Sequence, residues 1–243
     1  MKIAVTGKGG SGKTTIAAHL SVAFADKGYR VIAVDADPSL NMSAIFGYDD
    51  IKSIGEIKEI VEEKTKKADG IYILNPDVKD LIDRYSVKVK KNLNLIASST
   101  IKRADSGCLC PENALIKALM RELILDRDEV VIMDMEAGLE VMSRGTVKNI
   151  NKILVITETN RGSILVTEKI LRFSRELGIR DSYVIGNKIR NNDIKLLEER
   201  FDVFYYIPYL NEVQESSTYY SLLGKNTIFY KRIEELLERL IYG

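Results

Sequence analysis

Apolar runs of five or six residues alternate with longer amphipathic segments along almost the whole chain. The runs are rich in Val and Ile and carry few polar residues, which is typical of strands buried on both faces of a parallel sheet. The expected strands are 2–6, 30–35, 93–97, 129–134, 153–157, 182–187 and 203–207. The expected helices are 13–27, 53–66, 111–125, 163–177, 193–200 and 226–241. This alternation predicts an α/β fold, a mostly parallel twisted sheet with helices on both faces.

The pattern runs through the chain without repeats, low-complexity tracts or a linker, so we expect a single domain over 1–243. A core of that size can be well buried. Residues 48–92 are the least regular part and the richest in Lys and Glu. We expect them to form an exposed insertion on the same domain.

Charge and cysteine content narrow the class of protein. The 36 Lys and Arg residues balance 35 Asp and Glu residues, which argues against a general nucleic-acid-binding surface. No apolar run approaches the length of a membrane span, and Lys2 opens a core strand rather than a signal peptide. We therefore expect a cytoplasmic protein without nucleic-acid or stable membrane binding. Its two cysteines are then better explained as metal ligands or redox groups than as a disulfide.

A glycine-rich segment between the first strand and the first helix carries the clearest motif. Its sequence GKGGSGKT, residues 7–14, matches the phosphate-binding loop G-x-x-x-x-G-K-[ST]. Glycines let successive backbone N–H groups point inward, and the following helix adds its positive N-terminal end. We expect Lys13 to reach the β- and γ-phosphates and the Thr14 hydroxyl to ligate Mg²⁺. The predicted nucleotide-binding residues are Gly7, Lys8, Gly9, Gly10, Ser11, Gly12, Lys13, Thr14 and Thr15.

Acidic residues follow two of the expected strands. Asp35 and Asp37 lie at the end of the second strand, and Asp134 ends the strand VVIMD. Side chains at the carboxyl ends of parallel strands face the ligand crevice. Carboxylates there can hold Mg²⁺, directly or through water, and orient an attacking water. An ordinary Asp-Pro turn at 37–38 is the alternative. Gly138, just beyond, is placed to let a switch segment respond to the γ-phosphate.

Two further pairs follow later strands. Asn187 and Lys188 end the strand SYVIGN and are expected to contact the base. Pro208 and Tyr209 follow the next strand and are expected to close over that base. Both pairs also occur as ordinary turns.

Together these features resemble the MinD/ParA/nitrogenase-iron-protein group of deviant-Walker ATPases across essentially the whole chain. The resemblance rests on the loop with its extra Lys8, the DADP segment, the strand ending at Asp134, the NK pair and the IPY turn. It implies that the chain binds ATP, hydrolyses it to ADP and phosphate, and forms a homodimer when ATP is bound. It also implies that Lys8 contacts the phosphates of the partner subunit, Asp37 positions or activates the hydrolytic water, and Asp134 lies in the magnesium shell.

The cysteines Cys108 and Cys110 lie in SGCLCPEN, just before the helix expected from residue 111. Alternate residues of an extended segment point the same way, and a helix N-terminus favours thiolate. A tetrahedral thiolate site needs four ligands, which a twofold dimer supplies from two Cys-x-Cys pairs. Inert cysteines, a dithiol redox pair and an iron–sulfur cluster bridging the dimer are the alternatives. A disulfide across one residue would be strained. We expect His19 to be structural, on the packed face of the first helix.

The segments SGCLCPENALIKAL and DMEAGLEVMSRGT resemble the CooC family, ATPases implicated in nickel insertion into carbon monoxide dehydrogenase. This resemblance implies a metal-delivery ATPase. ATP and Mg²⁺ would close the dimer, Cys108 and Cys110 would hold Ni²⁺ or Zn²⁺, and hydrolysis would hand the metal to a client, carbon monoxide dehydrogenase. The chain departs from the family at Val141, where a histidine often follows the glutamate, so any role of that histidine is missing here.

Two other functions stay open at this point. A positioning ATPase of the MinD or ParA kind would bind membrane or DNA, and a MinD-like one needs a C-terminal amphipathic anchor. Apolar residues at helical spacing form a stripe near the C-terminus, namely Ile233, Leu236, Leu237, Leu240 and Ile241. Acidic residues share this segment, which disfavours binding to anionic lipid, and such a stripe is more often part of the core. The other function is an iron–sulfur ATPase acting as a scaffold or reductase.

Overall fold

The computed structural model describes residues 1–66, 72–99, 111–125, 127–136, 149–179, 181–190, 193–218 and 221–243. Within them lies one eight-stranded sheet with the order β3-β4-β2-β5-β1-β6-β7-β8. All its strand pairs are parallel except β3–β4, which is antiparallel. The strands are β1 (Lys2–Gly7), β2 (Val31–Asp35), β3 (Val87–Lys90), β4 (Leu93–Ala97), β5 (Val130–Asp134), β6 (Lys152–Thr157), β7 (Ser182–Ile189) and β8 (Val203–Pro208).

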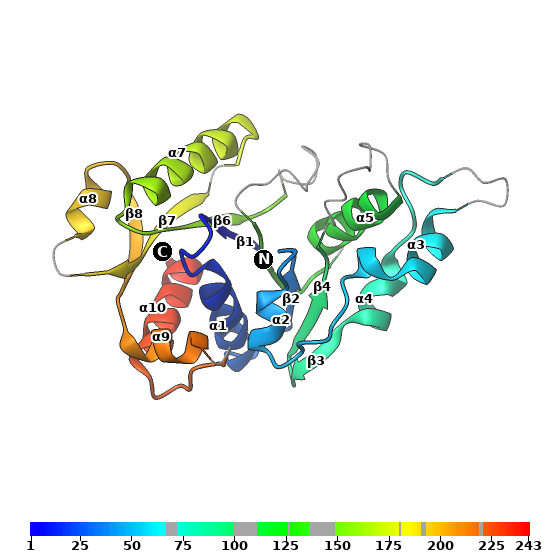
Figure 1. Ribbon diagram of the computed structural model, residues 1–243, viewed down its shortest axis with the longest axis horizontal. Helices are drawn as coiled ribbons and strands as arrows, with labels where there is room; N and C mark the ends of the chain where they lie inside the picture. The colour runs from blue at the N-terminus through cyan, green and yellow to red at the C-terminus, as the bar shows by residue number, and fades with distance from the viewer. Residues whose placement is uncertain are drawn as a thin grey trace.

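Helices cover both faces of this sheet (Figure 1). One face carries a 3-10 turn, η1 (Ile54–Glu56), and the helices α3 (Lys58–Thr65), α4 (Lys79–Tyr85), α5 (Pro111–Leu125), α7 (Arg161–Glu176) and α8 (Ile194–Glu198). The other face carries α1 (Lys13–Asp26), α2 (Asn41–Ile45), α9 (Asn211–Thr218) and α10 (Ile228–Tyr242). The predicted α/β class is therefore confirmed.

The central strands are apolar throughout because each of their faces packs on a separate core. In β1, Ile3 and Val5 belong to the core beneath α1 and α10, whereas Ala4 belongs to the core beneath α5 and α7. All six residues of β1 are buried. Successive strand side chains point to opposite faces, so a strand covered on both sides shows no polar alternation. This confirms the interpretation of the Val/Ile runs.

The seven predicted strands and all six predicted helices exist, with boundaries that shift by a few residues. The helix expected over 53–66 is interrupted, because Ser53 and Glu56 form a capping box that closes η1 before α3 begins at Lys58. Within the described ranges, four short elements were not predicted, namely β3, α2, α4 and α9.

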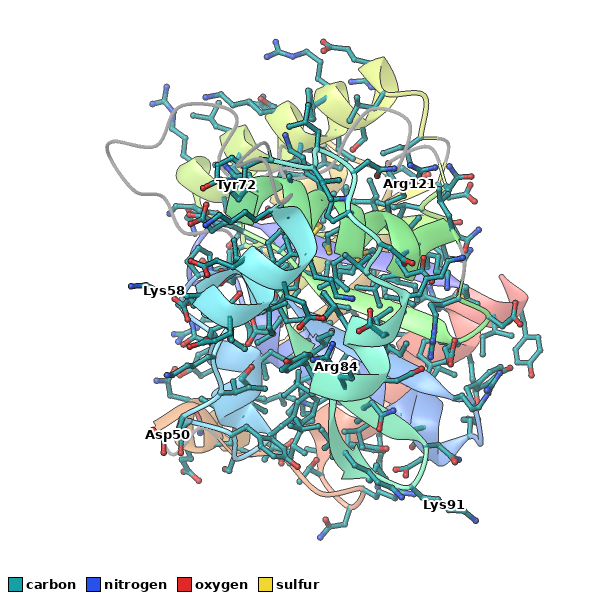
Figure 2. All side chains as sticks on the ribbon, turned by 90° about the vertical axis from the view of Figure 1, so that its right-hand side faces the viewer. Asp50, Lys58, Tyr72, Arg84, Lys91 and Arg121 are labelled. Atoms are coloured by element: carbon teal, nitrogen blue, oxygen red, sulfur yellow. The ribbon has the colours of Figure 1, made fainter. Side chains whose placement is uncertain are left out.

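The expectation that 48–92 is an exposed insertion needs correction. Its described part adds the antiparallel edge strand β3 and packs η1, α3 and α4 against the sheet and α5. Six of its apolar residues are buried in the core, namely Ile54, Ile60, Val61, Val78, Leu81 and Ile82. Its charged residues occupy the outer side, where Figure 2 shows Lys58, Arg84 and Lys91. The charge run is thus the solvated side of a segment whose apolar side is core.

The apolar stripe near the C-terminus belongs to the core, as its helical spacing suggested. Helix α10 packs on α1, and Ile233, Leu236, Leu237 and Leu240 are at most 2% exposed. These side chains are not available to a membrane surface. Among the described residues no helix is long and apolar enough to cross a membrane.

Candidate nucleotide site

The phosphate loop runs from the end of β1 to the start of α1, at the carboxyl edge of the sheet. Two of its glycines are required by space and by backbone conformation. Gly7 has φ +153°, and a Cβ there would lie 2.3 Å from the Ile156 carbonyl oxygen. Gly12 has φ +92°, and its Cβ would lie 2.3 Å from Nδ2 of Asn187. The loop is thus pressed against the ends of β6 and β7, which only glycine permits.

Asn187 and Lys188 support this loop from the end of β7. The Asn187 amide donates to the Ser11 carbonyl at 2.8 Å, and the Lys188 ammonium donates to the Gly10 carbonyl at 2.6 Å. Lys188 also pairs with Glu158 at 2.8 Å and has a left-handed φ of 57°. Sequence reasoning missed this supporting role. That these two residues contact a base stays a prediction.

Lys13 and Asp37 form a buried ion pair at 3.1 Å. The other Asp37 oxygen accepts from the Ser39 backbone N–H at 3.0 Å and the Ser39 hydroxyl at 2.7 Å. Burial alone would raise the pKa of Asp37, but the Ser39 hydrogen bonds and Lys13 outweigh it and hold the pKa below its ordinary value. Asp37 is therefore a fixed, ionised carboxylate beside the loop lysine. Ser39 was not predicted, although an Asp followed two residues later by Ser is a turn signal.

Asp35 and Asp134 lie opposite each other on the neighbouring strands β2 and β5. Asp35 accepts from the Ser43 N–H and hydroxyl through one oxygen, while its other oxygen has no hydrogen-bond partner. Neither Asp134 oxygen accepts a well-formed hydrogen bond, although the Thr14 hydroxyl lies close enough to act on this carboxylate. Burial raises the pKa of Asp35 to about 6 and that of Asp134 to about 7, although the Thr14 hydroxyl and Lys13 oppose the second shift. The two buried carboxylates therefore have oxygens that accept no well-formed hydrogen bond.

Such oxygens fit a hard cation. Mg²⁺ takes oxygen ligands, commonly one or two carboxylates together with waters and substrate phosphates. Thr14, Asp35 and Asp134 supply this chemistry next to the phosphate loop. Among the described residues no group of three or more His, Cys, Asp or Glu side chains is arranged to hold a metal alone. Mg²⁺ at such a site is commonly completed by substrate phosphates and waters.

A cavity of about 440 Å³ opens beside the loop. Its polar end is formed by the loop and Thr15, and its other end by the apolar side chains of Ile207, Pro208, Leu210 and Val213. The predicted base contacts Asn187, Lys188, Pro208 and Tyr209 all line it. The Arg190 guanidinium stacks on the Tyr209 ring at 3.9 Å from its centroid. A polar end for phosphates and an apolar end for a planar base suit a nucleotide.

Lys8 lies on the outer side of the loop and is exposed. Its ammonium passes over the first turn of α7, where a Cβ on Gly162 would lie only 3.2 Å from it. The side chain thus extends away from the loop's own phosphate cradle. A contact with the phosphates of a partner subunit stays a prediction.

Cys108, Cys110, Gly138 and Val141 lie outside the described residues. The starting points of their segments are nevertheless described. The Ser98 N–H, just after β4, donates to the Asp35 carbonyl at 2.8 Å. Helix α5 begins at Pro111, and its buried face, which includes Leu115 and Leu119, fixes it to the sheet.

Comparison with known proteins places the chain in a family. Residues 2–226 match the model of the CobQ/CobB/MinD/ParA nucleotide-binding domain. The chain is 37% identical to an uncharacterised ATP-binding protein of Methanocaldococcus jannaschii, over 99% of this chain and 98% of that protein. It is 35% identical to the carbon monoxide dehydrogenase accessory protein CooC of Rhodospirillum rubrum, over 88% of this chain and 86% of that protein.

A solved structure of similar fold is the MinC:MinD cell division protein complex of Aquifex aeolicus. The TM-score is 0.71 with 18% identity, covering 100% of this chain and 96% of that one. At this identity the likeness bears on the fold alone. The matched family and the CooC relative agree with the loop, the acidic pair and the cavity. The chain therefore belongs to the CobQ/CobB/MinD/ParA nucleotide-binding family and is a CooC-type ATPase within it.

Proposed function

We propose that this ATPase delivers a metal ion, Ni²⁺ or Zn²⁺, to a client enzyme during the maturation of carbon monoxide dehydrogenase. The observation that carries the proposal is the 35% identity to the CooC of Rhodospirillum rubrum, combined with the pair Cys108 and Cys110. Thiolates are suitable ligands for both metals. The pair immediately precedes α5, whose N-terminal end favours the thiolate form.

The positions of the described strands support a link between nucleotide and metal. The phosphate loop leaves β1, the cysteine segment leaves β4, and the segment with Gly138 leaves β5. Strands β4 and β5 both pair in parallel with β2, and β1 pairs in parallel with β5. All three segments therefore begin at the same edge of the sheet. In this proposal the nucleotide and the metal site communicate through the strand ends at this edge.

The nucleotide half of the proposal uses the residues of the loop and the acidic edge. The base lies in the apolar end of the cavity, and Lys13 leaves Asp37 to bind the β- and γ-phosphates. Asp37, still held by Ser39, is then free to orient the hydrolytic water. Mg²⁺ bound near Thr14 and Asp134 would neutralise the phosphate charge.

The metal half requires two copies of the chain. One chain supplies two thiolates, and a closed tetrahedral site needs four, so the ATP-bound homodimer forms the site across its twofold axis. Lys8, which extends away from its own loop, is the proposed contact to the nucleotide of the partner. Hydrolysis loosens the dimer and releases the metal to the client.

Metal analysis of the protein with and without a non-hydrolysable ATP analogue, alongside its molar mass in solution, tests this function. We expect a dimer with about one Ni²⁺ or Zn²⁺ when the analogue is present. Cys108→Ser and Cys110→Ser should lose the metal, whereas Leu109→Ala, which alters the same segment but keeps both thiols, should retain it. Unchanged metal content in the cysteine variants would refute the thiolate site.

The same samples distinguish the iron–sulfur alternative. A bridging cluster would give a brown protein with visible charge-transfer absorption after anaerobic purification. The proposed function predicts bound nickel or zinc without that absorption.

A further inference from the structure

The chain's one histidine, His19, lies directly behind the nucleotide cavity. It sits in α1, one turn after Thr15, and is 1% exposed. Its ring meets the ring of Phe229 edge-on, with centroids 4.9 Å apart and planes at 87°. Thr15 and Phe229 both line the cavity, on opposite elements. His19 thus contacts the cavity wall from its buried side.

Both ring nitrogens of His19 are engaged. Nδ1 lies 2.7 Å from the Thr15 carbonyl, and Nε2 accepts from the Leu223 backbone N–H at 2.9 Å. A carbonyl can only accept and an amide can only donate, so Nδ1 carries the proton and Nε2 is the bare acceptor. Burial lowers the pKa of His19 to about 4, against the Thr15 hydrogen bond, so the ring is neutral at pH 7.

The residues attached to His19 are linked to one another along the cavity wall. Leu223 lies two residues after Ser221, whose N–H donates to the Ser216 carbonyl at 3.2 Å, and both serines line the cavity. The Phe229 N–H donates to the Glu212 carboxylate at 2.6 Å, which ties the start of α10 to α9. Helix α9, residues 221–223 and the start of α10 are therefore linked, and His19 attaches them to α1.

We infer that His19 is a positioning residue for the base half of the nucleotide site. It sets the distance between the phosphate loop, which leads into α1, and the wall that faces the base. The inference rests on the base placement proposed above. Phosphates bind the loop whether or not this wall is in place, whereas a planar base needs the wall to lie at a fixed distance from the loop. His19 therefore contributes to the affinity for the nucleoside part of ATP and not for its phosphates.

His19→Phe tests this directly, because it keeps a ring against Phe229 and removes the acceptor for the Leu223 N–H. We measure the dissociation constants of Mg²⁺–ATP and of Mg²⁺–tripolyphosphate, which carries the phosphates alone. The ATP constant should rise roughly 5- to 20-fold, as expected for one buried hydrogen bond, and the tripolyphosphate constant should stay within about twofold. In turnover, KM for ATP should rise while kcat at saturation stays unchanged.

Two variants give matched controls. Ser21→Ala removes another buried hydrogen bond within α1, from the Ser21 hydroxyl to the Ala17 carbonyl at 2.8 Å, on a residue that does not line the cavity. It should leave both constants unchanged. His19→Gln restores an amide donor and acceptor and should recover part of the ATP affinity, which also keeps the test open if His19→Phe does not fold.

The outcomes separate this inference from the base placement. Equal weakening of ATP and tripolyphosphate by His19→Phe, or weakening of neither, would overturn the positioning role. Val213→Trp fills the apolar end of the cavity and should weaken ATP without affecting tripolyphosphate. If Val213→Trp leaves ATP binding intact, the base lies elsewhere and the inference falls together with the placement. If Val213→Trp weakens ATP and His19→Phe does not, the base placement stands and only the role of His19 fails.

Discussion

The phosphate loop and the acidic pair Asp35–Asp134 lie side by side at one edge of the sheet, yet the fold treats their polar groups in opposite ways. The carbonyls of Gly10 and Ser11 and the ammonium of Lys13 each have a side-chain partner before any nucleotide arrives. One oxygen of Asp35 and both oxygens of Asp134 accept no well-formed hydrogen bond. The loop backbone and Lys13 are held in place, even though the buried Ser11 hydroxyl also has no hydrogen-bond partner, whereas the buried acids have charged oxygens left unsatisfied.

This difference shows where the molecule gives up stability for function. A preformed loop lowers the ordering cost of binding phosphate. Buried carboxylates without partners destabilise the nucleotide-free protein and are relieved only by a proton or a cation. Perturbed pKa values of this kind gather at functional sites. Three substitutions test the contrast, from the largest expected effect to the smallest.

Gly12→Val should give the largest effect. A side chain at φ +92° is strained, and its Cβ would collide with Asn187, one of the two residues that hold the loop. We expect ATP hydrolysis to fall by about 100-fold or more, because misplacing the phosphates removes both positioning and charge stabilisation. Gly28→Ala is the control. Its φ is also +92°, but it has open space around it and lies outside the site. It should lower the melting temperature without a comparable loss of the hydrolysis rate at low temperature. Equal losses of rate in Gly12→Val and Gly28→Ala would argue against a preformed loop.

Asp134→Asn should stabilise the nucleotide-free protein while abolishing Mg²⁺-dependent hydrolysis. The folded protein keeps the proton on this carboxyl up to about pH 7, whereas an aspartate with its ordinary pKa of 3.8 has already lost it. Ionisation of Asp134 therefore destabilises the folded protein as the pH rises from 3.8 to about 7. Removing the charge should raise the free energy of unfolding by roughly 2–4 kcal/mol at pH 8 and by little below pH 4. Urea unfolding at both pH values measures this. A destabilised variant at pH 8 would contradict the description of Asp134 as an unsatisfied acid.

Asp37→Asn should have the opposite sign. Folding favours the ionised form of this carboxylate through Ser39 and Lys13, so its stabilisation is present above pH 3.8 and is lost as the pH falls through the lower folded pKa. We expect the free energy of unfolding to fall by about 1–2 kcal/mol at pH 7, with the difference shrinking in acid. The same urea titrations give the value. If both Asp→Asn substitutions changed stability in one direction, the contrast between the paired and unpaired acids would fail.

Much of this fold could be predicted because its strands are buried on both faces. Continuous apolar runs identified β1, β2 and β5, and the expected helix at 111–125 is α5 itself. The elements missed are short or amphipathic. Strand β3 has the sequence VKVK, alternates in polarity and lies antiparallel at the edge of the sheet. From the sequence alone, this alternation of Val and Lys cannot be distinguished from a solvated segment.

The site divides in the same way. The phosphate loop and the three aspartates follow from local motifs and strand ends. The support of Ser11 by Asn187 joins residues 176 positions apart, and the bond from Leu223 to His19 joins residues 204 positions apart. Only the sheet order and the packing of α10 on α1 bring these groups together. Local patterns therefore identify the candidate residues, while long-range packing decides which residues hold them in place.

The most direct test of nucleotide-controlled metal delivery is to follow release of bound Ni²⁺ or Zn²⁺ to a chelator during a single turnover of ATP. The dimer is first loaded with metal in the presence of ATP or a non-hydrolysable analogue. We predict retention with the analogue, and release with ATP at the rate of hydrolysis. Asp37→Asn, which lacks the carboxylate proposed to orient the water, should retain the metal with either nucleotide. Release at the same rate with and without hydrolysis would contradict the account.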